Sequence, residues 1–91
     1  MNKEVELRKL GKKVFEEENI NRIIEILDEA VEKDIITDYF FTDDSDLFVL
    51  TNKKAYIITA DYNKQYDTTI INVFEIPVKQ YFEIKKLYVP E

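Results

Sequence analysis

The sequence lacks the residues on which most enzyme sites depend. It contains no cysteine and no histidine, which excludes disulfides, thiolate nucleophiles, cysteine-ligated zinc and imidazole bases. Its one glycine, Gly11, cannot build a glycine-rich phosphate loop, and its one serine, Ser45, lies among aspartates outside any nucleophile motif. These absences predict a protein that is not an enzyme, with no catalytic residues and no cofactor.

Carboxylates are the remaining candidates for chemistry. Asp43, Asp44 and Asp46 lie close together, but this stretch has no glycine for the sharp turn of an EF-hand loop. Glu75 and Glu83 lie within apolar stretches, where a carboxyl with a raised pKa would be sought. Solvent-facing or edge positions explain these two residues better, so we expect neither a metal site nor acid and base catalysis.

The length and composition of the chain limit the classes of protein to which it can belong. A chain of 91 residues that is 45% hydrophobic and 35% charged is expected to fold as a single domain, residues 1–91, around one core. No apolar run approaches the roughly 20 residues that cross a bilayer. The first ten residues are charged throughout and lack the apolar stretch of a secretory signal. We therefore expect a cytoplasmic protein that does not associate with membranes.

Helical periodicity dominates residues 1–34. Leu7, Leu10 and Val14 recur at i, i+3 and i+7, and a second apolar stripe follows. This second stripe consists of Ile20, Ile23, Ile24, Leu27, Ala30 and Val31. On one continuous helix the two stripes would face different directions, so the pattern predicts two helices with a break around residues 18–21, where asparagine can cap the second helix.

Beyond residue 34 the composition changes to β-branched and aromatic residues, which are typical of strands. The predicted strands are residues 35–42, 47–50, 55–60, 69–76 and 80–88. Turns are predicted at residues 51–54 and 62–67, and Pro77 separates the last two strands. The expected fold is α+β: two N-terminal helices followed by a curved antiparallel sheet of four to five strands, with residues 35–91 forming a meander.

Several of these strands are apolar on both faces. A sheet covered by helices on one side normally shows polar residues on the other side, whereas residues 55–60 and 69–76 place apolar side chains on both. The second face could be covered by curling of the sheet, by the second helix, by a second copy of the protein or by a partner. The sequence leaves these alternatives open.

The net charge of −6 is unevenly distributed along the chain. Residues 1–15 hold five basic and two acidic residues, residues 16–46 hold two basic and twelve acidic residues, and the remainder is nearly neutral. A solvated helix face and loop would explain much of this pattern, but not its sign bias, because neighbouring carboxylates on one helix repel each other. The candidate acidic binding patch is Glu25, Asp28, Glu29, Glu32, Asp38, Asp43, Asp44 and Asp46.

These observations favour a small acidic protein-binding or inhibitory module, of the kind encoded by phages or mobile elements. Its acidic segment would dock on a basic surface of a larger protein. Tyr62 and Tyr66 border a polar loop and are candidate aromatic contacts. Direct nucleic-acid binding is not expected, because the only basic cluster is small and can pair with nearby glutamates. The alternative is a self-associating structural domain, a homodimer without catalytic activity.

A family resemblance covers residues 46–86. The segment Leu-Thr-Asn-Lys-Lys-Ala-Tyr-Ile-Ile at residues 50–58, followed by Phe-Glu-Ile-Pro-Val-Lys at residues 74–79, resembles bacterial pleckstrin-homology-like domains. The resemblance implies a curved, partly closed sheet used as a binding scaffold. The chain departs from the family, which has a seven-stranded barrel closed by a C-terminal helix, because its helices come first and a strand, not a helix, is expected before Pro90 and Glu91.

Overall fold

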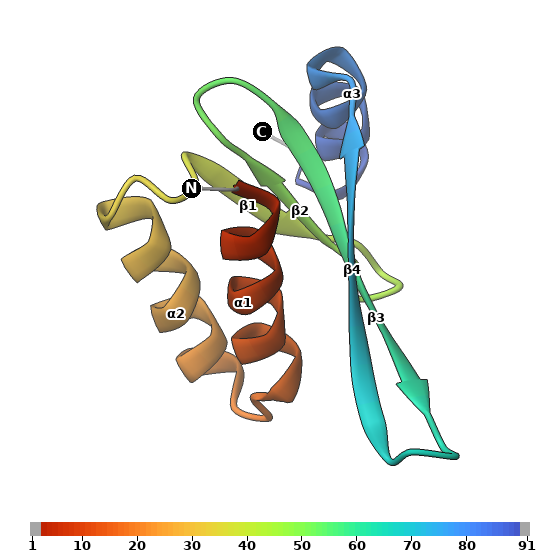
Figure 1. Cartoon of the computed structure of the whole chain (residues 1–91). Coiled ribbons are helices and arrows are strands. Elements are labelled where there is room, and N and C mark those ends of the chain that lie inside the picture. Colours follow the sequence, from red (N-terminus) through yellow and green to blue (C-terminus); the bar gives the residue numbers. More distant parts are fainter. Residues whose placement is uncertain (1–2, 90–91) are drawn as a thin grey trace.

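The computed structural model describes residues 3–89; Met1, Asn2, Pro90 and Glu91 lie outside the described residues. The elements in chain order are α1 (Lys3–Glu16), α2 (Ile20–Glu32), β1 (Asp38–Phe41), β2 (Leu47–Leu50), β3 (Ala55–Asn63), β4 (Thr68–Ile76) and α3 (Val78–Tyr88). The strands form one open sheet in the order β1-β2-β3-β4, each antiparallel to the next (Figure 1). The predicted α+β class, with two N-terminal helices before an antiparallel sheet, is confirmed.

The break between the two N-terminal helices lies where the sequence predicts it. Asn19 is the N-cap of α2, and its side-chain oxygen accepts a hydrogen bond of 2.9 Å from the backbone N–H of Asn21. This bond satisfies one of the amides that the first turn of a helix leaves unpaired. The cap allows α1 and α2 to lie side by side on the same face of the sheet (Figure 1).

The strand predicted over residues 80–88 is wrong: these residues belong to α3. Their aromatic and β-branched content suggested a strand, but the side chains that reach the sheet follow helical spacing, with Tyr81 buried and Ile84 packed beside it. Pro77 precedes the helix as its N-cap instead of separating two strands. Residues 78–88 therefore do not continue the predicted β meander, and the sheet formed within residues 3–89 has four strands.

Strand boundaries differ from the prediction at both ends of the sheet. The strand expected over residues 35–42 begins only at Asp38, because the chain must first leave α2 through Asp34 in the left-handed region at φ 60°. Ile36 in this connection is fully buried in the core. The β3–β4 hairpin is longer than expected, since pairing continues to Asn63 and Thr68, and its far end projects beyond the helices (Figure 1).

The main core lies between the sheet and the two N-terminal helices. α1 crosses β3 and β4 closely at Gly11, where an added Cβ would lie 2.7 Å from Cγ2 of Ile58 and 3.0 Å from Cγ2 of Ile71. The glycine therefore allows helix and sheet to approach. The buried residues of this core are Leu7, Leu10, Val14, Leu27, Ala30, Ile36, Leu47, Val49, Tyr56, Ile58 and Ile71.

The opposite face of the sheet is covered in part by α3. Tyr81 packs edge-on against Phe40, with ring centroids 5.1 Å apart, and Phe40 stacks on Phe48 at 4.9 Å. The Tyr81 hydroxyl donates a 2.8 Å hydrogen bond to the carboxylate of Asp38, which also pairs with Lys85 at 2.7 Å. A C-terminal helix thus provides part of the cover that the two-sided strands require.

Candidate functional site

The outer surface of α2 combines exposed apolar side chains with carboxylates. Ile20 is 60% exposed and Ile24 is 42% exposed, and both lie one turn apart in a row that ends in Asp28. Four of the predicted patch residues share this helix. We call the α2 surface the set Ile20, Ile24, Glu25, Asp28, Glu29 and Glu32, all of which are exposed.

Pairing within the chain reduces the negative field of the α2 surface. Glu25 pairs with Arg22 at 2.8 Å and Glu29 with Lys33 at 2.8 Å. The hydrogen bond and charge of Lys33 hold the pKa of the Glu29 carboxyl below its usual value. Glu32 has no such partner among residues 3–89. The surface therefore keeps an acidic character, but a weaker one than the sequence alone indicates.

Asp28 is fixed by a contact from the sheet. It accepts a 2.8 Å hydrogen bond from the hydroxyl of Tyr39 on β1. Burial, together with this bond to Asp28, raises the pKa of the Tyr39 phenol to about 12. The phenol therefore remains a hydrogen-bond donor at neutral pH and holds α2 against the edge of the sheet.

The structure does not bring the predicted acidic patch together. Asp38 lies under α3, bound to Tyr81 and Lys85, and serves to anchor that helix. Asp43, Asp44 and Asp46 lie in the β1–β2 turn, across the sheet from α2 (Figure 1). The predicted patch is therefore two separate surfaces and one structural carboxylate.

The β1–β2 turn places carboxylates beside β3. Burial first, and then the charges of Asp44 and Asp61, raise the pKa of the Asp46 carboxyl. Asp61 accepts a 2.7 Å hydrogen bond from the side-chain amide of Asn72. Within residues 3–89, no group of three or more acidic side chains is arranged to hold a metal ion. We call Asp44 and Asp46, together with the neighbouring Asp61 of β3, the turn carboxylates.

Tyr62 and Tyr66 lie at the exposed end of the β3–β4 hairpin, away from the α2 surface. The Tyr62 hydroxyl donates a hydrogen bond to the carboxylate of Asp67, and this bond raises the pKa of the Tyr62 phenol. Exposure of both tyrosines permits contact with a partner, but they share no surface with the carboxylates of α2.

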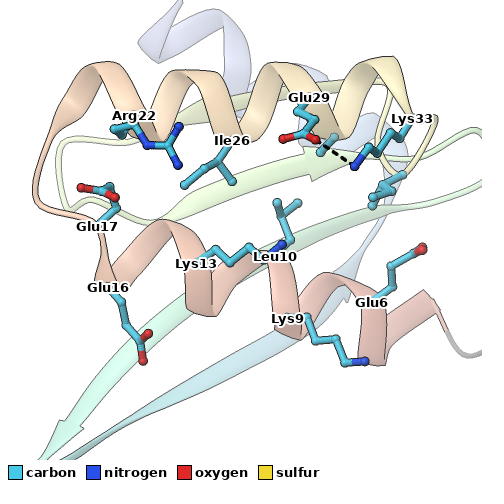
Figure 2. A pocket seen from close by; sticks show the side chains of 12 residues that line it. Glu6, Lys9, Leu10, Lys13, Glu16, Glu17, Arg22, Ile26, Glu29 and Lys33 are labelled. Carbon is cyan, nitrogen blue, oxygen red and sulfur yellow. Dashed lines mark ion pairs between the residues drawn. The ribbon is translucent and has the colours of Figure 1, made fainter.

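An open groove of about 560 Å³ lies between α1 and α2 (Figure 2). Its lining mixes aliphatic side chains with equal numbers of cations and carboxylates, so it has no charge preference for a ligand. The charged side chains are Lys9, Lys13, Arg22, Lys33, Glu6, Glu16, Glu17 and Glu29. Within the groove, Lys33 lowers the pKa of the Glu29 carboxyl, which is the opposite of the raised pKa that a general acid needs.

A further apolar surface lies on the sheet face that carries α3. Ile70 and Phe74 of β4 are 45% and 56% exposed, and they point to the same side as Ile57 and Asp61 of the paired strand β3. Phe82 of α3 is 44% exposed beside Tyr81. α3 therefore leaves the hairpin half of this face bare. We call Ile70, Phe74 and Phe82 the bare sheet face.

One of these two apolar surfaces can be predicted from the sequence better than the other. The two-sided pattern of residues 69–76 indicates apolar side chains in need of cover, and Ile70 and Phe74 are among them. Ile20 and Ile24 belong to the apolar stripe predicted for the second helix, and periodicity alone does not show which members of a stripe a neighbouring element covers. Both are exposed, although Leu27 and Ala30 of the same stripe are buried.

Comparisons of the chain with protein-family models, curated proteins and solved structures gave no match. Over residues 3–89, every helix is too short or too polar to span a bilayer.

Proposed function

We propose that the chain is a protein-binding module that docks the α2 surface on a larger protein. The observation that carries this proposal is the row of Ile20 and Ile24, two large aliphatic side chains left in water next to exposed carboxylates. Protein interfaces typically combine an apolar centre with a polar, charged rim. The α2 surface has this composition on a single rigid element.

The chemistry of the surface indicates the chemistry of its partner. The two isoleucines fit an apolar groove, as an amphipathic helix does when it binds through residues one turn apart. Glu25, Asp28 and Glu32 at the margin fit basic residues around such a groove. The same carboxylates repel phosphates, so the proposed partner is a protein and not a nucleic acid.

Capture from cells of the source organism tests the proposal. Immobilised wild-type chain should retain a partner that the double variant Ile20→Ser, Ile24→Ser does not retain. Both side chains are exposed, so the double variant is expected to stay folded, which circular dichroism checks. Lys53→Ser in the exposed β2–β3 turn is the matched control and should retain the partner.

The role of charge is tested separately on the captured partner. Reversal of Glu25 and Glu32 to lysine should slow association and flatten its dependence on salt, because exposed charges act mainly on the association rate. Equal capture by wild type and by the isoleucine double variant would reject α2 as the interface.

A further inference from the structure

The side of the sheet that carries α3 has two halves: the hairpin half is apolar, and the half covered by α3 is basic. Lys79, Phe82 and Lys86 lie on one face of α3, since their spacing is i, i+3 and i+7. The exposed Glu83 lies on the same face between the two lysines, so these three charged residues carry a net charge of +1. Both lysines are exposed, and neither forms an ion pair within residues 3–89. Next to α3, the hairpin half of the face presents Ile70 and Phe74.

Acidic residues border the hairpin half. Asp61 is paired with Ile70 across the two strands, so both point to the bare side of the sheet. Asp44 and Asp61 each lie close enough to Asp46 for their charges to raise the pKa of its carboxyl, after the effect of burial. None of the three turn carboxylates forms an ion pair in the described part of the chain. The α3 half therefore carries a net positive charge, whereas the hairpin half is bordered by negative charge.

α3 covers only one of the two halves of this side of the sheet. α3 rises above the sheet at one end, and the hairpin extends past it with no helix above it (Figure 1). A two-fold rotation about an axis between these halves would lay the helix of each copy on the bare hairpin of the other. An interface of this kind is isologous and closes on itself as a dimer.

We propose that the bare sheet face is the two-fold interface of a homodimer. In it, Phe82 of one copy packs against Ile70 and Phe74 of the other, and Lys79 and Lys86 face the turn carboxylates. A stable interface buries about 800 Å² per partner, which is roughly one eighth of the 6512 Å² surface of this chain. The proposal is independent of the α2 surface, which lies on the other side of the sheet and stays free in the dimer.

Sedimentation equilibrium tests the dimer. At about 0.5 mM, far above a micromolar Kd, the wild-type chain should sediment at about twice its 10.9 kDa mass. Phe74→Ser should weaken the association by roughly tenfold or more, because it removes an aromatic side chain from the centre of the interface. Phe74 is exposed, so this variant should unfold at nearly the wild-type denaturant concentration.

A charge swap tests the pairing between copies. The variant Lys79→Glu, Lys86→Glu and the variant Asp46→Lys, Asp61→Lys should each remain monomeric, because like charges would meet across both halves of the interface. Mixed together, the two variants should form a heterodimer, since opposite charges then meet in both halves. The double variant Glu25→Lys, Glu32→Lys on α2 is the matched control and should dimerise as wild type does.

Three results would overturn the proposal. The first is a wild-type chain that stays at 10.9 kDa at every concentration. The second is a dimer that Phe74→Ser leaves unchanged, which would place the contact on another surface. The third is a pair of charge-swap variants that do not associate when mixed although both are folded.

Discussion

Single residues determine how closely the helices and the sheet can pack. Gly11 is buried and sits where α1 crosses β3 and β4, with no room for a Cβ against Ile58. In the sequence it appeared only as the one glycine of the chain, inside a helical pattern. Nothing in the sequence shows which neighbour approaches a helical glycine, because that neighbour lies more than forty residues away along the chain.

The change Gly11→Ala tests this close approach. Alanine favours the helix by about 1 kcal/mol, whereas forcing a methyl group into a filled core costs about 1–3 kcal/mol. We expect a net loss of about 1 kcal/mol in the free energy of unfolding, measured by urea denaturation. The exposed neighbour Lys12 provides the control, since Lys12→Ala should change stability by less than about 0.5 kcal/mol. A more stable Gly11→Ala variant would contradict the packing described.

Tyr81 links stability to alkaline pH. Burial and the hydrogen bond to Asp38 raise the pKa of its phenol above the ordinary value of 10.0. A group with a raised pKa in the folded state stabilises the fold below its unfolded pKa and loses that contribution as pH rises through the folded value. The free energy of unfolding should therefore decline above about pH 10.

The free energy of unfolding of the variant Tyr81→Phe should be about 1.5 to 3 kcal/mol lower than that of wild type at pH 7, because the substitution removes the hydrogen bond to the Asp38 carboxylate. Its stability should then decline less steeply above about pH 10 than that of wild type. Denaturation at a series of pH values measures both effects. Tyr66→Phe, at an exposed tyrosine whose hydroxyl has no hydrogen bond within residues 3–89, should follow wild type throughout.

At the scale of elements, the sequence predicts the N-terminal helices and the first four strands but not α3. Periodicity and the asparagine cap were sufficient for α1 and α2, because both signals are local. Residues 78–88 carry strand-forming side chains. They form a helix because helical spacing brings both Tyr81 and Ile84 onto the cluster that contains Phe40 and Phe48. Tertiary packing therefore overrides local propensity in this segment.

Proline substitutions distinguish a helix from a strand over residues 78–88. Glu83→Pro, in the interior of α3, should cost about 3 kcal/mol of stability. Val78→Pro should be tolerated, because Val78 is the first residue of the helix, where the missing N–H of proline has no partner to lose. Thermal unfolding compares the two variants. Equal losses would contradict the assignment of α3.

At the scale of the whole molecule, charge that is continuous in the sequence is divided in space. The acidic stretch of residues 16–46 predicts one binding patch, but β1 carries the chain from α2 to the far side of the sheet before Asp43. The candidate site could therefore be predicted only for α2. The proposed pairing of the α3 lysines with the turn carboxylates of a second copy could not be inferred without the fold, because only the fold shows that both groups belong to the same side of the sheet.

The most direct test of the proposed function is a map of the contact surface on the chain. Amide chemical shifts, recorded as the partner captured by the wild-type chain is titrated in, should change most over residues 20–32 of α2. The α1–α2 groove residues of α1 and the β2–β3 turn should change little. A map centred on the groove, the hairpin or the bare sheet face, with α2 unaffected, would contradict the proposal that α2 is the binding element.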